Sequence, residues 1–121
     1  MLDSKPETLA DLSSLTKIQI ETLQLHVAIR KAEINVSQAL QKRKNFGISR
    51  GTHYRILSQA RKNIRESIFT VAVAVQLGLI KQEDVQKLIS TVSSVPLDIQ
   101  PERMAEVVAL ATVLAERIVM S

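Results

Sequence analysis

Apolar and small residues recur at alternating steps of three and four along the first third of the chain. No glycine or proline interrupts the stretch from Leu12 to Lys44. This spacing is the heptad pattern of a helix with one apolar seam. We therefore predict a short flexible lead-in over residues 1–8 and one long helix over residues 9–44. The residues of the seam are Leu15, Ile18, Thr22, Leu25, Ile29, Ala32, Val36 and Ala39.

A second apolar row, made of Ile20, Leu23, Val27 and Ile34, falls on roughly the opposite side of this predicted helix. A helix with two apolar faces needs two partners. Later helices of the chain can cover one face, and a second copy of the protein can cover the other. The alternative is a monomeric bundle that buries both faces. We predict a homodimer or higher homo-oligomer that associates through Leu15, Ile18, Leu25, Ile29 and Val36.

A second long helix is predicted from about Arg50 to Leu77. Gly47 suits the turn before it, and Ser49 suits its N-cap. The first half carries an apolar stripe that includes His53, which we expect to be a core histidine. The second half, residues 68–77, is apolar nearly all round and predicts a central buried helix. The stripe consists of His53, Leu57, Ala60, Ile64 and Ile68.

Two shorter helices are predicted in the last third of the chain. Glu83 and Asp84 fall in the first turn of one, where the helix dipole favours acids. Pro101 suits the first position of the other. The pattern thus predicts an all-α, four-helix bundle-like fold in a single domain of residues 1–121. Residues 66–121 are expected to form its helical core.

The charge of the chain is concentrated in one segment. The formal net charge is only +4, yet residues 42–65 hold eight basic side chains and no acid, and the rest of the chain is mildly acidic. Such a concentration is typical of a surface that binds a polyanion. The alternative is a solvated helix face that is basic without a function. The eight residues are Lys42, Arg43, Lys44, Arg50, Arg55, Arg61, Lys62 and Arg65.

Residues 47–61 read Gly-Ile-Ser-Arg-Gly-Thr-His-Tyr-Arg-Ile-Leu-Ser-Gln-Ala-Arg. This segment resembles the recognition-helix half of a helix-turn-helix, in particular the promoter-reading region of bacterial sigma factors and related regulators. His53 departs from that pattern, which has a buried valine there. Lys42–Lys44 also stand where apolar residues end the preceding helix, which implies a longer connection than the usual turn. The matching residues are Gly47, Ile48, Ser49, Gly51, Thr52, Leu57, Ala60 and Arg61.

The resemblance implies a DNA interface on the basic segment 45–65. Arginine suits guanine, glutamine suits adenine, and lysine or serine can hold phosphates. The residues expected to contact DNA are Lys42, Arg43, Lys44, Ser49, Arg50, Thr52, Tyr54, Arg55, Ser58, Gln59, Arg61, Lys62 and Arg65.

The predicted function is that of a dimeric DNA-binding protein, either a transcriptional regulator or a nucleoid-associated factor. Two alternatives remain open. One is a helical protein–protein interaction or assembly subunit of a nucleic-acid-processing complex. The other is an RNA or single-stranded DNA binder that uses the same basic face.

Other chemistry is not indicated by the residues present. The chain has no cysteine, which excludes a disulfide scaffold and a cysteine-ligated metal. The sequence shows no catalytic set, phosphate-cradling glycine loop or metal-ligand spacing. We therefore expect no enzyme activity, no cofactor and no small-molecule ligand. With no signal peptide or membrane span read, the expected location is cytoplasmic, at the nucleoid.

Overall fold

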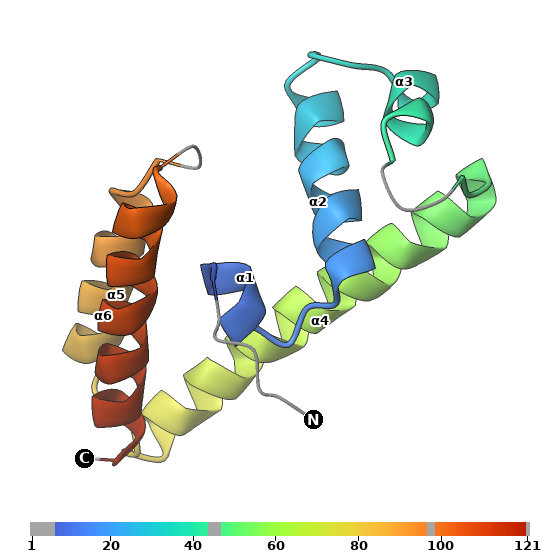
Figure 1. The fold of residues 1–121 in the computed structure, drawn as a ribbon. Helices are drawn as coiled ribbons and strands as arrows, with labels where there is room; N and C mark the ends of the chain where they lie inside the picture. The colour runs from blue at the N-terminus through green and yellow to red at the C-terminus, as the bar shows by residue number, and fades with distance from the viewer. Residues whose placement is uncertain (1–6, 44–46, 97–98, 121) are drawn as a thin grey trace, which may run out of the picture. The chain divides into compact units, whose positions relative to one another are not determined.

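The computed structural model describes residues 7–43, 47–96 and 99–120, and it shows an all-α fold (Figure 1). No strand occurs among these residues. The fold class predicted from the sequence is therefore confirmed, although the described residues form six helices rather than four. The helices are α1 (Leu9–Leu12), α2 (Lys17–Arg30), α3 (Val36–Gln41), α4 (Arg50–Gln76), α5 (Gln82–Ser93) and α6 (Pro101–Met120).

The predicted single helix over residues 9–44 is wrong, because the chain breaks twice in that range. At the first break, the Ser13 hydroxyl donates to the Ala10 carbonyl oxygen at 2.7 Å and ends α1. Thr16 and Gln19 then form a capping box. The Gln19 backbone N–H donates to the Thr16 hydroxyl at 3.2 Å, and the Thr16 N–H donates to Gln19 Oε1 at 3.1 Å. These bonds satisfy donors that a helix start leaves open, so α2 begins afresh at Lys17.

The second break separates α2 from α3. Ala32 adopts a left-handed backbone conformation with a φ of 59°. Residues other than glycine rarely adopt this conformation. Asn35 then caps α3 through a second reciprocal pair with Gln38, at 2.8 and 2.9 Å. Asparagine is among the best N-cap residues, so a new helix start is favoured here over continuation.

Helix α4 begins and ends where the sequence indicates, to within one residue. Ser49 acts as the predicted cap, since its hydroxyl accepts the Thr52 backbone N–H at 3.1 Å. At the other end Gly78 has a φ of 79°, and the Leu79 N–H donates to the Ala74 carbonyl oxygen at 3.0 Å. This is the glycine-terminated C-cap that helices commonly use.

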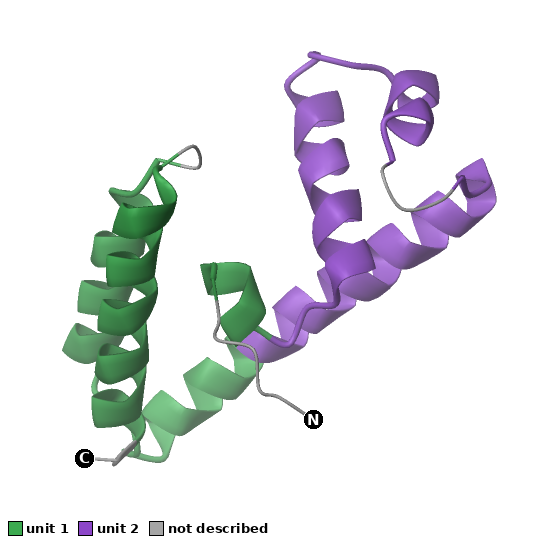
Figure 2. Cartoon of the chain, viewed as in Figure 1, with its two compact units in different colours: residues 1–13, 68–121 green, residues 14–67 purple. Residues whose placement is uncertain are grey.

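The chain divides into two compact units, which Figure 2 colours separately. Unit 2 comprises residues 14–67 and holds α2, α3 and the first two-thirds of α4. Unit 1 comprises residues 1–13 and 68–121 and holds α1, the end of α4, α5 and α6. Each unit has buried side chains of its own.

The core of unit 2 is small and partly polar. Ala39 from α3 and Ile56, Leu57 and Ala60 from α4 are its buried apolar side chains. Three polar side chains are buried with them, Thr22 on α2, Arg43 just after α3 and His53 on α4. His53 therefore lies in the core, as its place on the apolar stripe predicts.

In unit 1, α5 and α6 pack side by side in opposite directions, and α1 packs on α6 (Figure 1). The buried positions Val108, Ala111 and Ile118 all lie on α6. Residues 68–76 are helical as predicted. The expectation that residues 68–77 are buried is wrong, since most of their large apolar side chains are exposed. Helices α5 and α6 pack against each other and leave this part of α4 largely uncovered.

Candidate nucleic-acid interface

The first two-thirds of α4 separates apolar from basic residues around its circumference. His53, Ile56, Leu57 and Ala60 face the core of unit 2. At 100° per residue, the side of the helix opposite to them carries Arg55, Ser58, Lys62 and Arg65, and all four are exposed. We call these four residues the basic face. Gln59 is exposed at its border.

A shallow groove runs along the edge of the basic face. Its volume is about 360 Å³, and three cations but no acid line it. The lining positions repeat at helical spacing, so the groove follows one side of α4 for about three turns. Two hydroxyl groups lie toward the start of α4 and three cations follow them, and both kinds of group can bind phosphates. The lining residues are Tyr54, Leu57, Ser58, Arg61, Lys62 and Arg65.

One acid lies beside this surface. Glu66 Oε1 is 3.8 Å from the Lys62 amine, and both side chains are about two-thirds exposed. Exposed pairs of this kind contribute little to stability. The free-energy cost of breaking this pair is therefore small, so Lys62 can bind a phosphate in place of the carboxylate.

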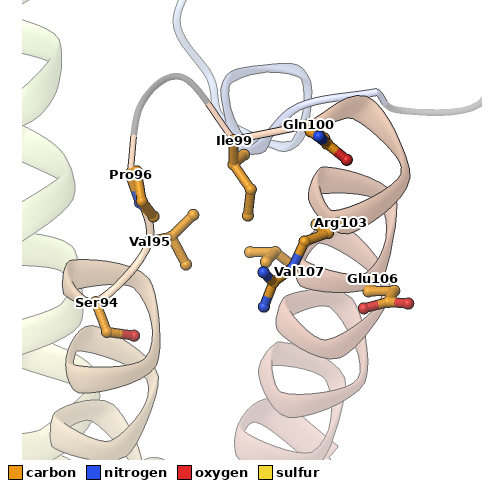
Figure 3. Close-up of a pocket in the computed structure, with 8 residues that line it drawn as sticks. All are labelled: Ser94, Val95, Pro96, Ile99, Gln100, Arg103, Glu106 and Val107. Atoms are coloured by element: carbon orange, nitrogen blue, oxygen red, sulfur yellow. The ribbon is translucent and has the colours of Figure 1, made fainter.

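A second hollow lies at the α5–α6 turn in unit 1 (Figure 3). It is larger, about 490 Å³, but its lining mixes apolar side chains with one cation, Arg103, and one acid, Glu106. The guanidinium of Arg103 points between the two helices, whereas Glu106 points away (Figure 3). Without a charge excess, this hollow does not compete with the α4 groove for a polyanion.

Arg43, predicted to clamp a phosphate, is buried instead, and this expectation is wrong. Its side chain is 1 % exposed. One guanidinium nitrogen donates to the Thr22 hydroxyl at 2.9 Å and lies 3.3 Å from His53 Nδ1. The other lies 3.3 Å from Glu21 Oε1. The charge of Arg43 thus joins α2 to α4 inside unit 2 and is not available to DNA.

The contact with Arg43 fixes the state of His53. Because a guanidinium only donates, His53 Nδ1 must accept, which places the ring proton on Nε2. Burial lowers the pKa of His53 below its ordinary value, and the positive charges of Arg43 and His26 lower it further. The pKa of His26 on α2 is also lowered, by burial and by Arg61 and Arg30. Both rings therefore favour the neutral form.

We expect acid to destabilise unit 2 through these rings. Unfolded histidine takes up a proton near pH 6.5, whereas the folded rings resist protonation until a lower pH. The unfolded state therefore binds more protons as the pH falls below about 6.5, so the melting temperature should drop between pH 7.5 and 5.5. Thermal unfolding followed by circular dichroism measures this. His53→Gln should make the drop smaller, and an unchanged drop in that variant would contradict the assignment.

Other residues predicted to contact DNA lie around the connection between α3 and α4, and their surroundings differ. Lys42 is exposed at the end of α3. Arg50 is exposed at the start of α4, where its guanidinium donates to the Ser37 hydroxyl at 3.2 Å. The Ser49 hydroxyl caps α4 and donates to the Thr52 hydroxyl at 2.9 Å, so both of its hydrogen-bonding roles are used within the helix start. Lys44 lies outside the described residues.

The residues predicted to mediate association on the first helix are divided among three segments. Leu15 lies between α1 and α2, Val36 lies on α3, and Ile18, Leu25 and Ile29 lie on α2. All five are half-buried. Because the heptad row is divided among three segments, it does not form the continuous seam that the sequence suggests.

The buried polar cluster around Arg43 consists of Arg43, His53, Thr22 and Glu21. The sequence pattern missed the last two. Thr22 was read as a small residue of the seam, but its hydroxyl accepts from Arg43 and donates to the Ile18 carbonyl oxygen at 2.8 Å. Glu21 carried no signal, since its partner lies 22 positions along the chain. The only hint of this cluster in the sequence was that His53 stands on an apolar stripe within the basic segment.

The described residues contain no group of three or more histidines, cysteines or acids able to hold a metal ion. None of the described helices combines the length and the hydropathy needed to cross a membrane. No protein-family model, no curated protein and no solved structure was found to match this chain.

Proposed function

We propose that this protein binds duplex DNA through the basic face of α4 and acts as a transcriptional regulator or nucleoid-associated factor. The observation that carries the proposal is the placement of Arg55, Lys62 and Arg65 on the side of α4 that faces away from the core, with Arg61 at its edge. These side chains are free to approach a phosphate backbone, because the core of unit 2 lies on the opposite side of the helix.

The local architecture supports a helix presented to the major groove. Ala39 of α3 is fully buried, and Ser49 caps α4 after a connection of eight residues. A short helix followed by a capped and exposed one is the arrangement that helix-turn-helix proteins use to present a recognition helix. The connection is longer than the usual turn, as the basic residues after α3 imply.

Duplex DNA is preferred to single strands because the chain is poor in aromatic side chains. It has one tyrosine, two phenylalanines and no tryptophan. Single-strand binders stack bases on aromatic side chains, whereas Tyr54 is the one aromatic residue in the α4 groove. A double helix needs cations along a groove, which this surface supplies.

The salt dependence of binding tests the proposal. If four cations per chain neutralise four phosphates, the slope of log K against log salt is about −3.6 for each bound chain. Fluorescence anisotropy with a duplex of about 25 base pairs, from 50 to 300 mM salt, measures it. Competition with single-stranded DNA and RNA of the same sequence ranks the ligands. A flat salt response, or preference for either competitor, would contradict the proposal.

A single-residue variant tests whether Arg61 contacts DNA. Arg61→Ala should make the slope less negative by about 0.9, as expected for one lost phosphate contact. The matched control is Arg117→Ala, which removes an exposed arginine from α6. The control should leave the slope unchanged, and equal changes in both variants would assign the effect to net charge alone.

A further inference from the structure

We infer that the second half of α4 is the surface through which two copies of this chain associate. Phe69, Val73 and Leu77 follow one another at steps of four, so they form one stripe on the helix. Their exposed fractions are 63, 50 and 68 %. Large apolar side chains in a regular exposed row are typical of a contact surface.

The surroundings of this stripe are also apolar. Ile68 and Val71, on the opposite side of the helix, are 63 and 40 % exposed. No charged residue occurs from Ser67 to Ile80. A helix that is apolar all round is stable in water only when something covers it. Within unit 1, α5 and α6 cover each other instead.

The stripe supplies a large part of the area that a dimer requires. Phe69, Val73 and Leu77 are each between half and about two-thirds exposed. With about 150–250 Å² for a large side chain, the three present on the order of 350 Å². A stable dimer buries about 800 Å² on each partner, of which about 65 % is apolar. The stripe therefore supplies more than half of the apolar portion of one such interface.

The absence of charge favours a second copy over another partner. A two-fold interface sets the same patch against itself, so any charge near the axis would face its own copy. Residues 67–80 avoid this repulsion completely. Helices that lie on lipid carry lysine and arginine along a polar face, which this stretch lacks. Ala72 and Ala74, between the large side chains, leave grooves into which the ridges of a second helix can pack.

The oligomeric state of matched variants tests the inference without DNA, so its outcome is independent of the proposed function. Val73→Glu buries an unpaired carboxylate in the interface and should raise the dimer dissociation constant by at least about 100-fold. The matched control is Val27→Glu, because Val27 on α2 is 47 % exposed, nearly the same as Val73. Sedimentation of the full chain should give a monomer for Val73→Glu and a dimer for the control and the wild type.

A cross-linking experiment keeps the inference testable if Val73→Glu fails to fold. The chain has no cysteine, so one introduced thiol can react only with its copy. In an antiparallel pairing centred on the stripe, oxidised Val73→Cys forms a covalent dimer, and Val27→Cys does not. A mixture of Phe69→Cys and Leu77→Cys chains should cross-link more than either chain alone.

Two results would overturn the inference. One is a wild-type chain that stays monomeric at 100 µM or more, including one that binds lipid vesicles as a monomer, since a protein–protein dimer of this area associates well below that concentration. The other is a dimer that survives Val73→Glu but dissociates with Val27→Glu. That result would place the interface on α2.

Discussion

Arg43→Ala should lower the free energy of unfolding of unit 2 by about 3 kcal/mol, because removing one member of a buried ion pair leaves the other group without compensation. The Arg43 side chain is 1 % exposed and is the common partner of Glu21, Thr22 and His53. Its loss would leave a carboxylate, a hydroxyl and a ring nitrogen in a cavity that apolar neighbours cannot fill.

Urea unfolding followed by circular dichroism measures this change. Lys42→Ala is the control, since Lys42 is the adjacent basic residue and is exposed. The control should stay within about 0.5 kcal/mol of the wild type. Replacing both buried partners, as in Arg43→Met with His53→Val, should recover part of the loss by removing two polar groups together. Equal stability of Arg43→Ala and Lys42→Ala would show that the buried cluster is not structural.

The second large effect concerns DNA affinity. Reversing the charge of Arg55, Lys62 and Arg65 with glutamate should weaken duplex binding by about 1,000-fold or more. Three charge-assisted contacts contribute about 1.5 kcal/mol each, and each 1.4 kcal/mol is a factor of ten. The fold should be unaffected, because all three side chains are exposed. Anisotropy titrations at 100 mM salt measure the affinity, and circular dichroism checks the helix content.

A control with the same change in net charge separates a located site from general attraction. Lys87, Arg103 and Arg117 are exposed on α5 and α6, and their replacement by glutamate alters the net charge equally. This control should weaken DNA binding by less than 10-fold, since long-range attraction between exposed charges is largely screened at that salt concentration. Comparable losses in the two triple variants would remove the basic face from the proposal.

The two departures from the helix-turn-helix pattern have one structural explanation. The sequence places His53 where an apolar residue is expected and basic residues where the preceding helix should end. In the structure Arg43 and His53 lie 3.3 Å apart in the core of unit 2. The imidazole accepts a hydrogen bond that the guanidinium donates, and this offsets part of the cost of burying both polar side chains. Arg43 and His53 each depart from the pattern, but together they form a hydrogen-bonded pair.

The breaks in the first predicted helix had a local signal that the heptad pattern masked. Thr16 with Gln19 and Asn35 with Gln38 have capping-box spacing. Apolar residues continue at helical steps through both breaks, and no glycine or proline marks them. Periodicity alone therefore predicted continuity. The left-handed backbone at Ala32 could not be foreseen, since alanine is the best helix former.

Features that depend on neighbours along the chain were predictable from the sequence. These are the all-α class, both ends of α4, its cap at Ser49 and the basic face opposite the core. Each follows from helical spacing or from the conformational preference of one residue. Tertiary structure decided that Arg43 is buried and that residues 68–77 are exposed. Burial depends on which distant side chains arrive at a position, and one-dimensional patterns of polarity do not contain that information.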